Sequence, residues 1–333
     1  MSLRVIKQGL LTSVQDLGRR GFQKYGVIVS GAMDSYSLRI ANLLVGNDEN
    51  EAGLEITLMG PLLQVEKDCV IAITGGDLSP AVNGEAIPMW KPIFVKKGST
   101  IKFGQCKRGC RAYLTVKGGF QLEKVLESKS TYLRGEIGGF KGRALKEGDE
   151  LHFAHVLNER PSFLSQNIGE GAITSQWSVH YEKFVPIANN DSIRVVHGSQ
   201  FDFFSSKSQQ EFTEKPFKVS TQSDRMGYRM EGPSLQLKEA KELLSEAVSQ
   251  GSIQVPPDGN PIILLADRQT TGGYPKIAQV ITTDLPLIAQ KKPGESVTFT
   301  YVSLKEAEKL YLEKEQELYK LKMGILLASK KLE

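Results

Sequence analysis

The sequence predicts a mainly β protein built from two tandem strand-rich units, each with one helix, and a C-terminal helix. The first observation is an internal repeat, because several short segments recur in the same order roughly 200 residues further along the chain. For example, residues 3–6 are echoed by residues 193–196, and residues 96–103 by residues 291–299. The second observation is that short apolar runs, such as residues 70–74, are bounded by glycine and proline, which is typical of barrels and sandwiches.

The repeat divides the chain into four expected parts. A first unit is expected at residues 1–155 and a second at 191–302. Between them, residues 156–190 are rich in Ser and Asn and are interrupted by proline, which indicates an irregular junction. The segment 303–333 has apolar residues at a spacing of three to four and is expected to be helical.

Local signals place single elements within the units. Asn83-Gly84 predicts a two-residue hairpin, because both residue types tolerate a positive φ. Asp34 or Ser35 is expected to cap the helix of the first unit. The helix of the second unit is expected where four apolar residues share one face: Leu237, Ala240, Leu244 and Val248.

Composition excludes several classes of protein. The 42 basic and 38 acidic side chains leave a net charge of +4, without the concentrated basic face of a nucleic-acid binder. The longest aliphatic run, residues 262–266, is far shorter than a membrane span, and the first residues lack the apolar stretch of a secretion signal. Three cysteines fit a reducing compartment. We therefore expect a cytoplasmic protein that binds neither nucleic acid nor membrane.

Common catalytic motifs are missing. The sequence has no P-loop, no H-E-x-x-H and no G-x-S-x-G. The four histidines lie between the glycine-rich clusters of the two units, so a histidine-based triad is not expected. Cys106 and Cys110 lack companions at the spacing of a zinc site, and no metal site is expected.

Four polar clusters remain as candidate sites. Residues 15–34 and 223–229 occupy equivalent places in the two units, and both combine acids, arginines and glycines. Residues 267–275 (DRQTTGGYP) follow the most apolar strand, and an arginine there suits a small carboxylated substrate or a phosphoryl group. Residues 128–143 could bind an anion through cations and glycine amides. The structural alternatives are glycine-rich barrel crossovers, a polar hairpin tip and, for residues 128–143, a solvated loop.

These clusters resemble the KipA-type proteins, the family of the 5-oxoprolinase C subunit, which is classed with biotin-dependent carboxyltransferase domains such as that of urea amidolyase. The resemblance extends over about residues 3–299 and is most specific in SDRMGYR (223–229) and DRQTTGGYP. It implies two cyclophilin-like β-barrels. It also implies that the protein acts with a KipI-type protein as the B subunit and with a third protein as the A subunit. Such a complex opens the lactam 5-oxoproline to L-glutamate and hydrolyses ATP, with Mg²⁺ expected alongside the nucleotide.

The resemblance and the clusters together suggest roles for single residues, which we state as hypotheses. We expect Asp34 or Asp224 to orient a nucleophile or a metal-bound nucleotide, and Arg225 to stabilise phosphoryl charge. Substrate or phosphate binding is expected from a larger set: Arg19, Tyr25, Ser30, Tyr228, Arg268, Gln269, Thr270, Gly272, Gly273 and Tyr274.

Two other functions stay open. KipA-type proteins are implied to relieve the inhibition by KipI of a sporulation histidine kinase, so the clusters could form a partner interface. Carboxyl transfer from carboxybiotin is the second alternative. Because the chain has no Met-Lys-Met biotinyl site, that reaction would need a separate carrier, and biotin is not the cofactor that we expect.

Overall fold

The computed structural model describes residues 2–154, 160–187, 191–239 and 241–330, which belong to two compact units. Unit 1 comprises Met1–Gly18, Asp34–Ala188 and Gln316–Glu333, and unit 2 comprises Arg19–Met33 and Asn189–Glu315. The segment 19–33 therefore belongs to unit 2, although the sequence repeat placed it in a first unit of residues 1–155. The expected limits at 155–156 and 190 fall on residues outside the described part of the chain.

Unit 1 contains two antiparallel sheets. In spatial order, one consists of β11 (Glu150–His152), β1 (Ser2–Lys7), β4 (Leu62–Val65), β9 (Thr100–Lys102), β6 (Ala81–Val82) and β7 (Glu85–Ala86). The other consists of β12 (Leu164–Asn167), β13 (Ala172–Ser175), β8 (Pro92–Val95), β5 (Cys69–Asp77), β10 (Arg108–Val116), β3 (Gly53–Thr57) and β2 (Leu11–Gln15).

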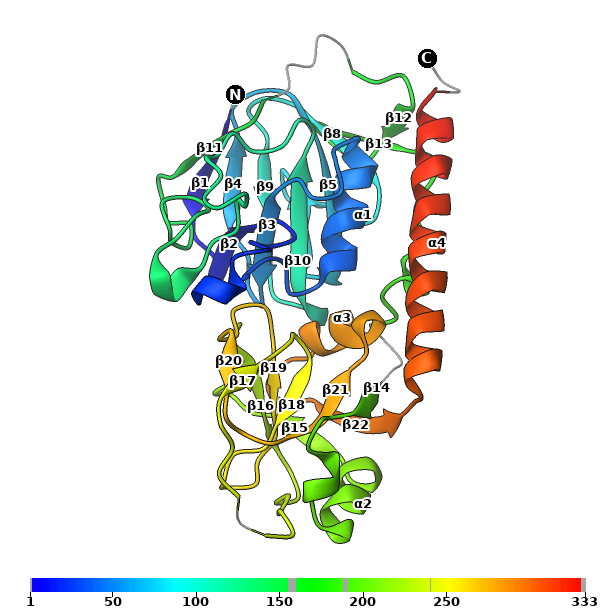
Figure 1. The fold of residues 1–333 in the computed structure, drawn as a ribbon. Helices are drawn as coiled ribbons and strands as arrows, with labels where there is room; N and C mark the ends of the chain where they lie inside the picture. The colour runs from blue at the N-terminus through cyan, green and yellow to red at the C-terminus, as the bar shows by residue number, and fades with distance from the viewer. Residues whose placement is uncertain (1, 155–159, 188–190, 240, 331–333) are drawn as a thin grey trace. The chain divides into compact units, whose positions relative to one another are not determined.

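The strand β5 shows why unit 1 has two apolar layers. Successive side chains of a strand point to opposite faces. Ile71 and Ile73 accordingly join the core shared by the two sheets. Val70 and Ala72 join a second cluster on the other face, together with residues of helix α1 (Ser35–Val45). Figure 1 shows α1 lying along this sheet, next to β5 and β10.

Helix α4 (Leu304–Lys330) is the C-terminal helix. Its residues from Gln316 onward belong to unit 1, where Leu318 and Ile325 are buried in the cluster that contains α1. Glu317 of this segment forms an ion pair of 2.5 Å with Lys183. No helix in the described residues combines the length and the apolar character that crossing a membrane requires.

Unit 2 is a closed barrel of seven strands. In order around the barrel they are β14 (Ser192–His197), β21 (Lys276–Val280), β18 (Ser252–Gln254), β19 (Ile262–Leu264), β16 (Gly227–Glu231), β15 (Phe217–Val219) and β22 (Ser296–Tyr301). β22 closes the barrel by pairing in parallel with β14. Beside the barrel, β17 (Glu246–Ala247) and β20 (Thr271–Gly272) form a two-stranded sheet.

The remaining helices are short. Helix α2 (Ser206–Glu214) begins after Ser205, whose hydroxyl accepts a hydrogen bond from the Ser208 amide, and its Phe212 is fully buried in the barrel core. Helix α3 spans Leu285–Ala289. The single 3₁₀ turns are η1 (Gln23–Tyr25), η2 (Leu133–Gly135), η3 (Tyr181–Lys183), η4 (Phe201–Phe203) and η5 (Thr282–Asp284).

The mainly β class is confirmed, and several local expectations are confirmed with it. Val82 pairs with Glu85 across the predicted hairpin, where Asn83 and Gly84 have φ values of 52° and 87°. Asp34, rather than Ser35, caps α1 by accepting a hydrogen bond from the Ser37 amide.

Two expectations were wrong. The helix predicted from Leu237, Leu244 and Val248 does not form, because these residues form contacts typical of strands. Leu237 forms a β-bridge with Phe204, and Val248 donates a backbone hydrogen bond to Thr270. Leu244 is 93% exposed, and Ala240 lies outside the described residues.

The junction expected at 156–190 is not irregular throughout. It contains β12 and β13, and β13 pairs with β8, so this segment extends the seven-stranded sheet of unit 1. The single-sequence pattern missed these strands because polar residues occupy most of the exposed edge strand β12.

Candidate anion-binding site

Three of the four polar clusters meet within unit 2, and Arg225 joins them. Its Nε and Nη2 atoms donate to the two carboxylate oxygens of Asp267 at 2.9 and 3.1 Å. Nη2 also donates to the Gly31 carbonyl oxygen at 2.6 Å. Arg225 and Asp267 are both 4% exposed. This forked pair therefore fixes the segment 19–33, here called the inserted loop, against the strand ends of the barrel.

Arg268 has a different environment, although it follows Asp267 directly. Within the described residues, the only hydrogen bonds of its guanidinium group are long ones, from Nε to the Val248 carbonyl at 3.4 Å and from Nη1 to the Leu265 carbonyl at 3.3 Å. No carboxylate of the described residues forms an ion pair with it. Burial, and then the positive charge of Arg20 on the inserted loop, lower the Arg268 pKa to about 10.

Arg20 is exposed and Arg268 is partly buried, and neither forms an ion pair with a carboxylate of the described residues. A partly buried charge is unfavourable unless it is paired, and an anion near the Arg268 guanidinium group would supply the missing charge. Guanidinium groups bind planar carboxylate or phosphoryl oxygens with two parallel hydrogen bonds. Arg268 is therefore suited to holding a small anion.

Ser30 gives a second sign of a binding site on the inserted loop. Its backbone has a φ of 55°, which non-glycine residues rarely adopt. Its side chain is 4% exposed, and its Oγ atom has no hydrogen-bond partner within the described residues. Both the backbone conformation and the unpaired hydroxyl disfavour folding, and such features concentrate at functional sites.

Other predicted residues of the inserted loop have distinct positions. Arg19 is 1% exposed, and its amide donates to the Val29 carbonyl at 2.7 Å, which closes the loop upon itself. Tyr25 ends the turn η1 and is 70% exposed, with the Lys24 Nζ atom 4.9 Å from its ring centroid. Arg19 is therefore placed in the interior and Tyr25 at the surface.

Asp224 and Tyr228 support the turn around Arg225. The Asp224 Oδ1 atom accepts hydrogen bonds from the amides of Met226 and Gly227 at 2.8 and 3.3 Å. Tyr228 is buried in the barrel core, and its hydroxyl donates to the Lys291 carbonyl at 3.2 Å. In this structure both contacts orient the chain at the place where Arg225 leaves the barrel.

The segment 267–275, here called the arginine loop, continues from Arg268 to a pocket. Gln269 is exposed, and the Thr270 carbonyl accepts the backbone hydrogen bond of Val248 at 3.1 Å. Gly272 pairs with Glu246 across β17 and β20. The loop is therefore held along its length by the strand that precedes Val248.

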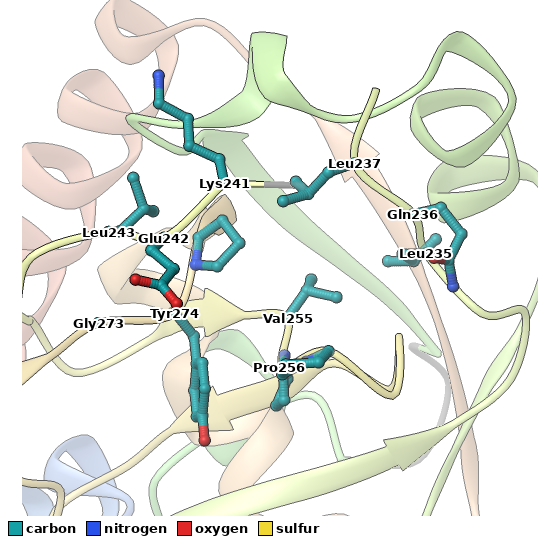
Figure 2. A pocket seen from close by; sticks show the side chains of 12 residues that line it. Leu235, Gln236, Leu237, Lys241, Glu242, Leu243, Val255, Pro256, Gly273 and Tyr274 are labelled. Atoms are coloured by element: carbon teal, nitrogen blue, oxygen red, sulfur yellow. The ribbon is translucent and has the colours of Figure 1, made fainter. Parts of the chain in front are cut away.

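The last residues of the arginine loop line a pocket of about 690 Å³ in unit 2. A Cβ atom on Gly273 would lie 3.2 Å from the Leu243 carbonyl oxygen, so the backbones approach closely there. Tyr274 is 47% exposed. Figure 2 shows its ring on one side of the pocket, with Leu237, Val255 and Pro256 on another side.

Asp34 belongs to unit 1. It is fully buried, and its carboxylate accepts hydrogen bonds from the Ser37 amide and hydroxyl at 3.0 and 2.6 Å. Its amide donates to the Tyr113 hydroxyl, which in turn donates to Glu55 at 2.8 Å. Burial, Glu55 and Asp34 raise the Tyr113 pKa well above its ordinary value.

The fourth cluster also belongs to unit 1, where it surrounds Asp16. This carboxylate is 3% exposed and accepts hydrogen bonds from the hydroxyls of Ser128 and Ser130 at 2.8 and 2.5 Å. It also accepts hydrogen bonds from the amides of Lys129 and Gly18 at 2.6 and 2.8 Å. The segment 128–130 is thus bound to Asp16 rather than freely solvated, and Asp16 fixes the chain just before the inserted loop.

Sequence reasoning missed Arg20, Gly31 and Asp267 as individual site residues. Arg20 and Asp267 stand beside residues that were selected, so only their relative burial and pairing could distinguish them. The described residues contain no group of three or more His, Cys, Asp and Glu side chains that could hold a metal ion.

Comparisons with known proteins agree over nearly the whole chain. A family model for the carboxyltransferase domain, subdomains A and B, matches residues 25–301. The C subunits of 5-oxoprolinase from Haemophilus influenzae and Escherichia coli are 41% and 38% identical to this chain. The alignments cover 90% and 92% of this chain, and 90% and 93% of those proteins.

Larger proteins contain a similar region. The urea amidolyase of Saccharomyces cerevisiae is 36% identical over 93% of this chain, which corresponds to 17% of that protein. The crystal structure of the K. lactis urea amidolyase matches 95% of this chain with a TM-score of 0.85 and 31% identity, over 20% of its own length. This chain therefore belongs to the carboxyltransferase domain family, subdomains A and B, and it is similar to the C subunit of 5-oxoprolinase and to a part of urea amidolyase.

Proposed function

We propose that this chain is one component of an ATP-dependent 5-oxoprolinase, which opens 5-oxoproline to L-glutamate together with a KipI-type B subunit and an A subunit. The observation that carries the proposal is the partly buried Arg268, whose guanidinium group has no carboxylate partner within the described residues and therefore suits an anionic substrate or a phosphoryl group. Two relatives that are named as the C subunit of 5-oxoprolinase, which match this chain over at least 90% of their length, support the same assignment.

The chemistry requires electrostatic stabilisation more than a nucleophilic side chain. Amide resonance makes a lactam a poor electrophile. Transfer of the γ-phosphoryl group of ATP to the lactam oxygen would make that oxygen part of a leaving phosphate. Water could then add to the carbon, and cleavage of the C–N bond would leave γ-glutamyl phosphate, which a second water hydrolyses to glutamate and phosphate. In this scheme Arg268 and Arg20 hold the phosphoryl oxygens or the substrate carboxylate.

The other residues of the site position the inserted loop and the bound anion. Arg225 holds the inserted loop through the Gly31 carbonyl oxygen, so it sets the place of Arg20 relative to Arg268. The Ser30 hydroxyl could donate a hydrogen bond to a bound anion. Mg²⁺ would come with the nucleotide phosphates.

The test is phosphate release by the chain co-expressed with its two partner proteins, with and without 5-oxoproline. Arg268→Lys keeps the charge but loses the fork, and Arg268→Met loses both. We expect Met to abolish 5-oxoproline-dependent phosphate release and Lys to retain a small fraction of it. Arg229→Met, at an exposed arginine on strand β16, is the matched control. Full turnover by Arg268→Met would remove Arg268 from the site.

Carboxyl transfer is the second candidate, and the similarity to urea amidolyase and to the carboxyltransferase family model favours it. It requires carboxybiotin on a separate carrier protein. Transfer of labelled carboxylate from carboxybiotin to an acceptor in the presence of the chain, with no ATP-dependent cleavage of 5-oxoproline, would support this function over the first.

A further inference from the structure

Helix α4 has an apolar face that is exposed. The helix packs on unit 1 through another face, where Leu318 and Ile325 are buried. Five further large apolar side chains of α4 are each between 41% and 65% exposed: Leu312, Tyr319, Met323, Leu326 and Leu327. Single apolar residues are common on protein surfaces, but a row of them along one side of a helix indicates an interaction surface.

The spacing of this row is that of a coiled-coil seam. Leu312, Gln316, Tyr319, Met323 and Leu326 follow one another at intervals of four, three, four and three residues. This alternation keeps the side chains on one narrow stripe, along which a second helix can pack. At 1.5 Å per residue, the stripe from Leu312 to Leu326 is about 21 Å long. A single polar residue within such a seam, here Gln316, helps to fix the register of the two helices.

The seam lies outside the region that the family comparison covers. Helix α4 begins at Leu304, after the residues 25–301 that the carboxyltransferase family model matches. The polar clusters of the candidate site all lie within or before that matched region. The seam therefore needs an explanation of its own.

The charges beside the seam change sign along the helix. On one flank Glu313 precedes Lys320 by seven residues, and both side chains are exposed. Each forms an ion pair within the helix, Glu313 with Lys309 at 3.8 Å and Lys320 with Glu317 at 2.9 Å. Exposed ion pairs of this kind contribute little to stability, so a partner helix can compete for both charges.

A second copy of α4 complements this pattern when the two helices run antiparallel. Leu312 of each helix then lies opposite Met323 of the second copy, and the apolar side chains of both helices are covered. In the same register, Glu313 of each helix lies beside Lys320 of the second copy. Because the arrangement is symmetric, it gives two attractive pairs, and charges at these flanking positions set the orientation of paired helices.

Other arrangements of two copies bring like charges together. An antiparallel pair shifted by one heptad, with Tyr319 opposite Met323 of the second copy, places the two Lys320 side chains side by side. A parallel pair places Glu313 beside Glu308 of the second copy. Like charges at such positions are unfavourable. The charges thus favour one orientation and one register.

We infer that α4 joins two copies of this chain through an antiparallel, two-fold symmetric helix pair. Such an interface is isologous, because each copy contributes the same surface. The inference does not rest on the proposed function. The seam is short, so its interface is at the small end of specific interfaces, and we expect a dimer that dissociates in the micromolar range or above.

The first experiment is sedimentation equilibrium of the full chain over a series of concentrations, which measures the dissociation constant of the dimer. Tyr319→Ser and Leu326→Ser should each weaken the dimer by at least about tenfold, because each substitution acts twice in a symmetric pair. Leu244→Ser is the matched control, at an exposed leucine that is not on α4, and should leave the dimer unchanged. Since the seam side chains are exposed, every variant should keep the Tm that the wild-type chain has at high dilution.

The second experiment tests orientation and register by exchanging charges. Glu313→Lys and Lys320→Glu each place like charges across the helix pair, so each alone should weaken the dimer by at least about tenfold. An equimolar mixture of these two variants should associate again, because every reversed charge then meets an opposite charge. Glu239→Lys, at an exposed glutamate outside α4, makes the same charge change and should have no effect.

Three results would overturn the inference: a chain that stays monomeric at its highest soluble concentration, a dimer that Tyr319→Ser does not weaken, and a mixture of the two charge variants that does not associate. A fourth result would assign the seam to another protein. If Tyr319→Ser releases a co-expressed KipI-type protein or A subunit, while the mass of the chain alone is unchanged, the seam binds that protein and the second copy is rejected.

Discussion

Replacing Arg268 by Met should stabilise the protein while it removes anion binding. The Arg268 pKa is lowered from 12.5 to about 10, chiefly by burial and then by Arg20. At roughly 1.4 kcal/mol per pKa unit, the cation costs the folded state on the order of 3 kcal/mol, which solvent screening of this partly exposed group reduces to about 1–2 kcal/mol. Met keeps the apolar stem and gives up two hydrogen bonds longer than 3.2 Å.

The sign of this effect follows from linkage. A base whose pKa is lower in the folded state is penalised at every pH below that pKa, so the penalty is fully present near neutrality and is relieved only above about pH 10. We therefore expect Arg268→Met to raise the Tm by ~2–6 °C, by a constant amount between pH 6 and 9. Differential scanning calorimetry at several pH values measures this.

Arg225→Met is the contrasting variant. It leaves Asp267 as an uncompensated buried charge and frees the inserted loop, and removing one partner of a buried pair costs about 3–5 kcal/mol. A Tm that falls as far in Arg268→Met as in Arg225→Met would refute the reasoning, because Arg268 would then be a structural residue.

Three further predictions concern Ser30, Asp16 and Asp149. Ser30→Gly should stabilise the protein by about 1 kcal/mol in chemical denaturation, since it relieves a positive φ and an unpaired buried hydroxyl, and a loss of stability would contradict this. Asp16→Asn should cost about 2–4 kcal/mol, because it weakens four hydrogen bonds to a buried carboxylate, and an unchanged urea midpoint would contradict it. The ion pair between Arg143 and Asp149 lowers the pKa of Asp149. The stability that Asp149 contributes is therefore present above pH ~4 and is lost as the pH falls below that value. The protection factors of the amides in the Asp149 turn, corrected for the intrinsic pH dependence of exchange, should fall over that range in the wild type and not in Asp149→Asn.

The sequence could predict those parts of the fold that local physics determines. The hairpin at Asn83-Gly84 depends on two residues that accept positive φ, and the start of α1 depends on a carboxylate cap. The repeat indicated a strand-rich chain because the same turn and strand signals recur. These features need no knowledge of distant contacts.

Tertiary contacts decided the rest. The apolar spacing from Leu237 to Val248 suits a helix, yet this segment pairs with Phe204 and with the arginine loop, and contacts of this kind override a weak local preference. The inserted loop precedes α1 in sequence but belongs to unit 2, where Gly31 accepts a hydrogen bond from Arg225 and Met33 is buried in the barrel core. No spacing rule in one sequence could predict these long-range contacts.

Residue types located the candidate site in the sequence, but they did not show which residue has which role. Arg225 and Arg268 both stand next to an aspartate in a polar cluster and carry the same side chain, so they look equivalent in sequence. The structure distinguishes them by partners: Arg225 has both oxygens of Asp267, and Arg268 has two weak carbonyl contacts. Asp34 likewise resembles a catalytic acid in sequence, whereas its carboxylate begins a helix.

The contrast between these two arginines is itself an argument for function. Selection for stability alone would favour an apolar residue in place of Arg268 and glycine in place of Ser30. The first change removes a partly buried charge, and the second removes an unpaired buried hydroxyl. Both unfavourable groups lie on loops that the well-paired Arg225 brings together. A site that must receive an anion has to keep donors unpaired until the ligand arrives, and it needs a rigid pair beside them to hold their positions. If the stabilised variant Arg268→Met also kept full 5-oxoproline-dependent phosphate release, the Arg268 charge would not be needed for activity. The site would then lie elsewhere in the molecule.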